Sequence, residues 1–432
     1  MSTQPNVEHP APAPRVPSVA WLAGLLRQPL FTNAGYLWGV TLVAALTGFL
    51  FWGLAARLYS PEEVGTASAV ISAVTLLAGI ATLGMGAGLV RFLPGARQPR
   101  RLLNTAFTFN ALAALLVAGI YLAGMPLWSP SLAGLRGNGL YVAGFLTFAV
   151  ATTLGGVLQM AFVARRRAGY TLAQTSVVNV GRLLLVVPLT GLGAAGLTGS
   201  VAIGFLVATA LSLVFFLPKV EVGYRPRPEF SWRDLAPILP YSAGNYLAGL
   251  LTQTPQLLLP LLILELLGPA SGGYAYIAWM LGAVLVSPGL ALASSAFAEG
   301  ANAPASLEAV LSRSRAAGLA LTGAGALVVA LGAPWLLRLF GAEYAAEATA
   351  LLRWLAAAAP LVVLARLYFT RLQVQKRIGE MILLSGVIAA LTLGLAAALV
   401  PRHGITANGV GWLLGNGLVA TLAVARMWRD HG

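Results

Sequence analysis

The fifth apolar segment of the chain carries a row of polar side chains that could face a ligand. Thr175, Asn179 and Arg182 follow a spacing of four and then three residues, so one face of a helix would present all three. A stripe that lines a water-filled cavity explains this pattern. A buried polar contact between neighbouring helices explains it equally well, and both interpretations stay open at this point.

Arg182 is the residue of this row whose charge is most costly to place inside a membrane. If its helix starts near Tyr170, a rise of about 1.5 Å per residue places Arg182 about 18 Å into a hydrocarbon core of about 30 Å. No acidic residue in the spans of the first half can pair with it. A guanidinium at that depth requires water or a counter-ion, which favours a wet cavity. The rival explanation is hydrogen bonding to helix carbonyls in a structural role.

Four further polar residues are candidates for the same cavity. Arg57 and Arg353 lie nearer the outer ends of their spans, where either a cavity or open water would accommodate them. Gln253 and Gln256 lie beside two prolines in the seventh span, and prolines bend helices and free backbone carbonyls. That segment is predicted to be a cavity-lining hinge, with a kink that serves only packing as the alternative. Arg366, close to the inner end of its span, is expected to extend to the membrane surface.

Residue types needed for catalysis or metal binding are scarce. The chain has no cysteine and only three histidines, which lie far apart, so we expect no metal, no cofactor and no catalytic residue. Carboxylates are also rare within the spans, and Glu265 is placed at the outer end of the seventh. An ion-driven carrier normally buries a carboxylate, so the identity of a coupling ion, H⁺ or Na⁺, stays open.

The elements that must position these residues are membrane-spanning helices. Hydrophobic residues make up 58% of the chain and charged residues 9%, whereas a soluble domain carries about 25% charged residues. About 20 apolar residues are needed to cross a bilayer, and this rule predicts an all-α membrane protein with about twelve spans. The predicted spans are 34–56, 65–90, 103–125, 140–164, 170–190, 197–217, 237–264, 273–297, 316–333, 347–370, 379–400 and 406–425.

The distribution of cations predicts the orientation of these spans. Twenty Lys and Arg residues fall on the side of the N-terminus and four on the other side, namely Arg57, Arg136, Arg338 and Arg402. Cytoplasmic loops retain excess positive charge, so both termini are predicted to be cytoplasmic, in a bacterial inner membrane. The net charge of +14 then indicates anionic membrane lipids as partners, and we expect no nucleic acid.

An internal repeat divides the chain into two halves of six spans. Pro61 and Gly65 match Pro269 and Gly273 at an offset of 208 residues. Three further pairs of landmarks follow in order at similar offsets. An even number of spans per copy predicts two lobes related by an axis along the membrane normal. The predicted domains are a tail with an interfacial segment at 1–30, an N-lobe at 31–217, a cytoplasmic linker at 218–236 and a C-lobe at 237–432.

Several short stretches together match the pattern of a known family. They are Leu337 to Tyr344 with Ala348, Leu351 and Leu352, Tyr59 to Gly65, and the basic turns ending at Gly169 and Gly379. With these stretches the chain resembles the multidrug/oligosaccharidyl-lipid/polysaccharide exporter superfamily, and specifically its polysaccharide flippase branch. The similarity covers the chain from about Leu30 onward.

The resemblance implies two six-helix lobes around a central cavity, alternating access, and an undecaprenyl-pyrophosphate-linked oligosaccharide as cargo for surface polysaccharide biosynthesis. Arg182 would then help to hold the anionic pyrophosphate. One alternative is a drug/cation antiporter of the same superfamily, which would need carboxylates within its helices. The other is a membrane polysaccharide polymerase or ligase, but the longest outer loop, at about 126–139, leaves little room for a catalytic domain.

Overall fold

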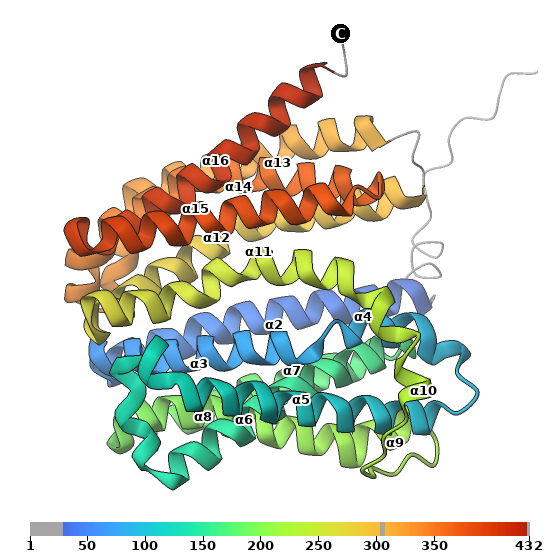
Figure 1. Ribbon diagram of the computed structural model, residues 1–432. Coiled ribbons are helices and arrows are strands. Elements are labelled where there is room, and N and C mark those ends of the chain that lie inside the picture. Colours follow the sequence, from blue (N-terminus) through green and yellow to red (C-terminus); the bar gives the residue numbers. More distant parts are fainter. Residues whose placement is uncertain (1–28, 303–306, 430–432) are drawn as a thin grey trace, which may run out of the picture.

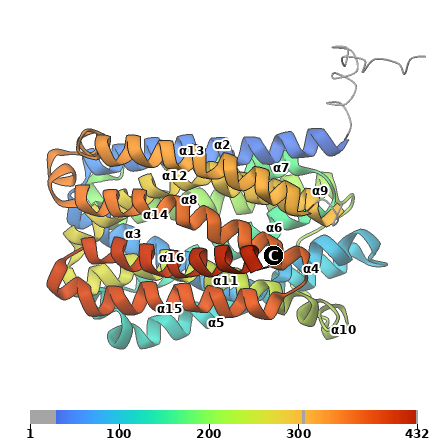
Figure 2. The ribbon, with the colours of Figure 1, turned by 90° about the horizontal axis from the view of Figure 1, so that it is seen from above.

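The fold was obtained as a computed structural model, which describes residues 29–302 and 307–429 (Figure 1). The predicted tail and interfacial segment at 1–30 lie almost entirely outside these residues. Every regular element in the described ranges is helical. The helices run roughly along one common axis, so that the chain passes repeatedly between two ends of the molecule (Figures 1 and 2).

The described part of the first half contributes seven α-helices of eight residues or more. They are α2 (Pro29–Leu58), α3 (Pro61–Thr82), α4 (Met85–Phe92), α5 (Pro99–Trp128), α6 (Gly139–Ala164), α7 (Ala168–Val186) and α8 (Gly193–Leu211). A short helix, η2 (Pro130–Gly137), follows α5, and α8 continues through η4 (Ser212–Phe216) into α9 (Leu217–Val220).

The second half follows a linker that contains the short helix α10 (Trp232–Leu235). Its long helices are α11 (Ile238–Leu267), α12 (Pro269–Asn302), α13 (Leu307–Arg338), α14 (Ala342–Val374), α15 (Ile378–His403) and α16 (Thr406–Arg429).

Eleven of the described helical segments are long and apolar enough to cross a membrane. Helix α7 is not among them, because Thr175, Asn179 and Arg182 interrupt its apolar sequence. It nevertheless packs along α2 on one side and α8 on the other, as the missing twelfth span would. The prediction of an all-α membrane protein with about twelve spans is therefore confirmed.

The starts of several helices follow from local sequence signals. Helix α3 begins with Pro61 at its first position, where the missing N–H of proline costs no hydrogen bond. Ser60 and Glu63 form a reciprocal capping box, in which the Ser60 N–H donates to Glu63 Oε2 at 2.9 Å. The region predicted as one span over 65–90 is divided between α3 and α4, because Leu83 (φ 46°) and Gly84 (φ 75°) both take left-handed backbone conformations.

The long helices pack against neighbours both within each half of the chain and between the halves. In the first half α7 lies between α2 and α8, and α6 packs against α5 and α8. In the second half α14 packs against α12, α13 and α16, and α15 packs against α11 and α16. The two halves meet where α3 packs against α11 and α12 (Figure 1).

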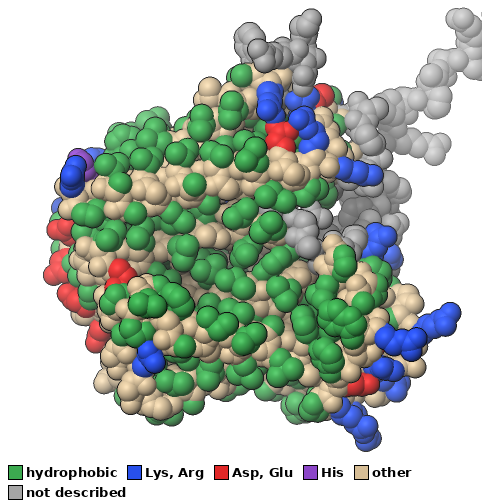
Figure 3. All heavy atoms as spheres, in the orientation of Figure 1, with side chains coloured by type: hydrophobic (Ala, Val, Ile, Leu, Met, Phe, Trp, Pro, Cys, Tyr) green, Lys and Arg blue, Asp and Glu red, His purple; other side chains and the backbone are tan. Residues whose placement is uncertain are grey.

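The two ends of the molecule differ in charge. The basic end contains the turns at 165–167 and 375–377 and the linker at 221–231, and Lys and Arg side chains gather there around α4 and α10 (Figure 3). The opposite end contains the turns between α2 and α3 and between α11 and α12. Apolar side chains cover much of the flank between the two ends in Figure 3, as a surface in contact with lipid requires.

Candidate functional site

The repeated landmarks of the two halves touch each other at the opposite end. A Cβ atom added to Gly65 would overlap the carbonyl oxygen of Pro269, and one added to Gly273 would overlap the carbonyl oxygen of Pro61. Glycine is therefore required at both positions, because only a residue without a side chain allows the backbones of α3 and α12 to approach this closely.

Two polar contacts join the halves at the same end. Arg57, the last basic residue of α2, donates from Nε to the carbonyl oxygen of Leu339 at 2.9 Å. Glu265 of α11 accepts hydrogen bonds from the N–H and the hydroxyl of Ser131 at 3.2 and 2.8 Å. These bonds and the glycine contact join the two halves at the opposite end in this conformation.

Two pairs of aromatic rings also join the halves. Trp52 of α2 packs on Tyr276 of α12 with ring centroids 4.4 Å apart. Phe49 of α2 meets Phe340, in the turn after α13, edge to face at 5.6 Å. The exposed end of α2 is thus held against the second half by both polar and apolar contacts.

Arg182 of α7 lies next to this aromatic contact. Its guanidinium carbon is 4.8 Å from the ring centroid of Phe51, which is fully buried, so the charge has a cation–π partner. A Cβ atom at Gly48 would lie 3.5 Å from Nη2, so the small residue on α2 leaves room for the guanidinium. Phe51 packs edge to face on Trp52, and Trp52 packs on Tyr276 of α12, so Arg182 lies close to the boundary between the halves. Its Nε is buried and has no hydrogen-bond partner among the described residues.

Thr175 and Asn179 occupy a different environment from Arg182. Both are buried, and the hydroxyl of Thr47 in α2 donates to Asn179 Oδ1 at 2.9 Å. Asn179 Nδ2 in turn donates to the carbonyl oxygen of Thr175 at 2.7 Å. Asn179 thus holds α7 to α2 through a neutral hydrogen bond, whereas Arg182 contacts the same helix α2 through the ring of Phe51.

The remaining predicted residues are spread over the second half. Arg353 of α14 donates to the carbonyl oxygen of Ala330 in α13 at 3.1 Å. Gln253 and Gln256 are exposed on α11. The structure therefore does not bring these residues together with Arg182, and their role in a cavity stays a prediction.

One charged residue that sequence reasoning placed at the membrane surface lies inside the second half. Arg366 lines a cavity of about 10 Å³ together with Thr252, Ser385 and Asn416, which come from three other helices. This volume suits about one water molecule. Arg366 lies nine residues before Gln375, the C-cap of α14, and is therefore more than two turns from the end of its helix. The sequence signal for this position was the presence of Thr252, Ser385 and Asn416 in otherwise apolar spans, because a guanidinium inside the protein needs polar partners.

Two larger hollows lie between the halves. A groove of about 590 Å³ runs between α3, α5, α11 and α15, with Leu77, Leu261 and Leu393 in its apolar lining. A second cavity, of about 310 Å³, adjoins the break between α3 and α4. There the hydroxyl of Tyr246 lies 2.8 Å from the carbonyl oxygen of Gly79, so α11 satisfies a carbonyl near the end of α3.

A comparison with family models finds one match. The model of a family described as polysaccharide biosynthesis protein matches residues 54–298, which is more than half of the chain. No curated protein matches the sequence.

Solved structures of membrane transporters and of a flippase have a similar fold. An inward-facing multidrug resistance transporter of the MATE family, in the MOP superfamily, aligns with a TM-score of 0.69 at 16% identity over 91% of this chain and 95% of that chain. Lipid II flippase MurJ in an inward closed conformation aligns with a TM-score of 0.75 at 11% identity over 90% and 86%. A MOP superfamily transporter from Pyrococcus furiosus aligns with a TM-score of 0.62 at 15% identity over 92% and 95%.

Proposed function

The chain belongs to the polysaccharide biosynthesis protein family and has the fold of a MOP superfamily membrane transporter, and from this premise we propose that it flips a polyprenyl-pyrophosphate-linked oligosaccharide across the membrane. The family description supports a role in polysaccharide biosynthesis, and a lipid II flippase shares the fold. The proposed reaction is movement of the lipid-linked sugar between leaflets without covalent chemistry, for the assembly of a surface polysaccharide.

The observation that carries this proposal is the environment of Arg182. The sequence contains no Asp or Glu between residues 64 and 220, so no carboxylate within the helices of the first half can neutralise this guanidinium. The side chain lies beside Phe51, and the neighbouring Trp52 packs on Tyr276 of the second half. A pyrophosphate that entered between the halves would supply the missing negative charge, and a guanidinium binds such oxygens through a planar fork of donors.

The contacts at the opposite end support an alternating-access cycle. The halves touch there through Gly65, Gly273 and Arg57, whereas the basic end carries the excess of cations that would attract an anionic headgroup. In the proposed cycle the substrate enters from the basic end, which faces the cytoplasm of a bacterium. The halves, at 31–217 and 237–432, then rock against each other so that the opposite end opens. Both termini would stay cytoplasmic.

A drug/cation antiporter is the second candidate, because a multidrug resistance transporter shares the fold. An organic cation requires a carboxylate or a similar partner inside its path. Glu265 is the acidic residue beside the groove of about 590 Å³, and it is bonded to Ser131 at the opposite end. Arg182 at the boundary would repel a cation, which favours the anionic cargo.

The test is reconstitution of the full chain in vesicles with a labelled polyprenyl-pyrophosphate oligosaccharide in one leaflet. We expect the protein to accelerate exposure of the label in the other leaflet, Arg182→Ala to abolish most of this activity, and Arg182→Lys to retain part of it. Arg402→Ala is the matched control, because Arg402 is exposed at the opposite end and its loss removes the same charge.

Equal rates for Arg182→Ala and the control, with normal membrane insertion, would disprove the substrate role of Arg182. Transport of an organic cation, with no acceleration of exposure of the labelled lipid, would instead support the function of a drug/cation antiporter.

A further inference from the structure

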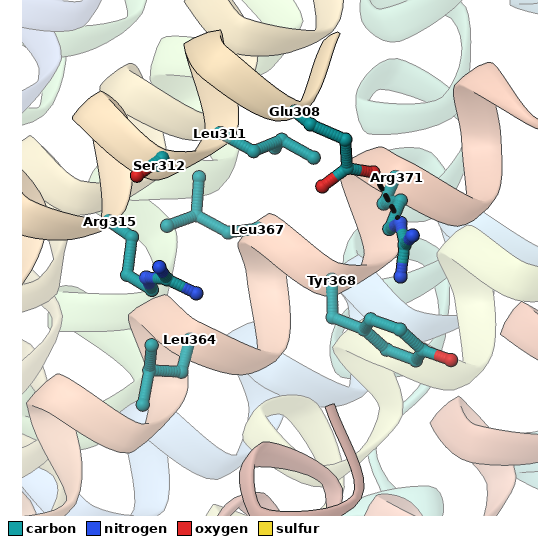
Figure 4. A pocket seen from close by; sticks show the side chains of 8 residues that line it. All are labelled: Glu308, Leu311, Ser312, Arg315, Leu364, Leu367, Tyr368 and Arg371. Atoms are coloured by element: carbon teal, nitrogen blue, oxygen red, sulfur yellow. Dashed lines mark ion pairs between the residues drawn. The ribbon is translucent and has the colours of Figure 1, made fainter. Parts of the chain in front are cut away.

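A small cavity lies on the flank of the second half, between α13 and α14 (Figure 4). Its volume is about 60 Å³, several times the 10–15 Å³ or so that one water requires, so it admits a group of several heavy atoms. Its lining residues are Glu308, Leu311, Ser312, Arg315, Leu364, Leu367, Tyr368 and Arg371. The cavity lies toward the basic end, because α13 begins at Leu307 and α14 ends at Val374.

Two arginines form the ends of this cavity. Figure 4 shows Arg315 at one end and Arg371 at the other, with Leu367 between them. Arg371 is held by Glu308, with Nε 2.8 Å from Oε1, and its side chain is 9% exposed. Arg315 is half-buried on the facing helix. Two guanidinium groups from different helices therefore face the same enclosed space.

The charges next to the cavity leave an excess of positive charge. The hydroxyl of Tyr368 donates to Glu380 at 3.0 Å and accepts from Arg426 at 3.0 Å. Glu380 also forms an ion pair with Arg377. The cavity and this adjoining cluster together contain four arginines, at 315, 371, 377 and 426, and two glutamates, at 308 and 380. Among the described residues, the arginines of the cavity and of this adjoining cluster therefore outnumber the glutamates by two.

An apolar track leads from the cavity toward the opposite end. Leu364, Leu361, Ala357 and Trp354 follow one another on α14 at intervals of three or four residues, so they share the helix face that carries Tyr368 and Arg371. Ala357 is exposed and the Trp354 side chain is 40% exposed. Small residues on α16 border this track, because Gly409 faces Trp354 and Gly417 faces Leu361.

We propose that this cavity binds the phosphate of an anionic phospholipid from the leaflet at the basic end, with an acyl chain lying along the apolar track on α14. A phosphate next to an apolar chain matches a basic cavity that continues into an apolar track at membrane depth. Basic pockets between membrane helices on the cytoplasmic side are suited to such headgroups. The site lies on α13 and α14, away from Arg182, and so would bind a lipid that is not the transported cargo.

The proposal is tested by measuring bound lipid on the purified full chain by native mass spectrometry, after exchange into detergent containing phosphatidylglycerol or phosphatidylcholine. We expect retention of phosphatidylglycerol over phosphatidylcholine. Arg315→Gln is expected to lower that retention about fivefold or more, which is the effect of losing one cationic contact with an anionic lipid. Arg313→Gln is the matched control, because Arg313 is exposed on the same helix and does not line the cavity.

A second variant separates the shape of the cavity from its charge. Leu364→Phe would narrow the cavity and the start of the track without removing a charge, and it is expected to weaken retention as well. If Arg315→Gln fails to fold, this variant alone decides the question. Equal losses in the variants and the Arg313→Gln control, or equal retention of the two lipids, would overturn the proposal. Displacement of phosphatidylglycerol by millimolar inorganic phosphate would overturn it too, because the site would then take free phosphate.

Discussion

The side chain of Arg57 donates a hydrogen bond of 2.9 Å to the backbone carbonyl of Leu339, which lies 282 residues later in the chain. Arg57 ends α2 in the first half, and Leu339 follows α13 in the second. The bond therefore has to break whenever the halves separate at this end. The carbonyl oxygen of Leu339 lies in the turn after α13, where no N–H of the described helices donates to it. Arg57 supplies the donor that this carbonyl needs.

Removal of this bond should favour opening at the opposite end. For Arg57→Ala we expect a shift of about fivefold in the ratio of open to closed molecules, because one charge-assisted hydrogen bond at a partly exposed site contributes about 1 kcal/mol. The chain has no native cysteine, so spin labels can be attached at Arg136→Cys and Arg402→Cys, one in each half. Distance measurements between them should show a larger long-distance population than in Arg338→Ala, which removes a neighbouring charge. Identical distributions would mean that the bond does not restrain the halves.

A methyl group should not fit where α3 and α12 cross. We expect Gly65→Ala and Gly273→Ala each to lower the free energy of unfolding by about 1–3 kcal/mol, or to force the opposite end open, because the added carbon would meet backbone that cannot move aside. Gly134→Ala, in open space on η2, is the control and should change little. Thermal unfolding and the distance measurement above report the two outcomes. Unchanged stability together with a closed opposite end would contradict the close approach of α3 and α12 at Gly65 and Gly273.

The contact between α2 and α7 should be energetically coupled. Thr47→Val and Asn179→Ala each remove one partner of the 2.9 Å bond, so their double-mutant cycle should give a coupling of about 0.6 kcal/mol, which is typical of interhelical bonds in membrane proteins. Unfolding of the purified protein in a denaturing detergent provides the free energies. Additive losses would indicate that the two side chains do not interact.

Both termini should lie in the cytoplasm if the basic end faces inward. Alkaline phosphatase fused after residue 429 should be inactive, whereas the same reporter inserted after Gly137, the last residue of η2, should be active. A C-terminal fusion with high activity would reverse the orientation of every helix and place Arg315 and Arg371 at the outer leaflet.

The sequence by itself determined that the chain is all-α and about how many membrane spans it has. The span predicted at 140–164 is α6 (Gly139–Ala164), because a bilayer requires about 20 consecutive apolar residues whatever their neighbours are. The polar span at 170–190 was also predicted, although α7 is less apolar than the other long helices. The repeat of Pro61 and Gly65 in Pro269 and Gly273 was visible as well, since it needs only a comparison of residue types along the chain.

Only the tertiary structure decided which partner each polar residue finds. Asn179 bonds to Thr47 of α2, while Arg182 on the same helix face lies over the ring of Phe51, also on α2, and no periodicity distinguishes a neutral hydrogen-bond partner from a cation–π partner. The partner of Arg57 is a backbone carbonyl, and carbonyls are identical in every residue, so its position cannot be read from side-chain types. Contacts of this kind depend on how distant helices are placed in three dimensions, whereas hydropathy depends only on the residues of one segment.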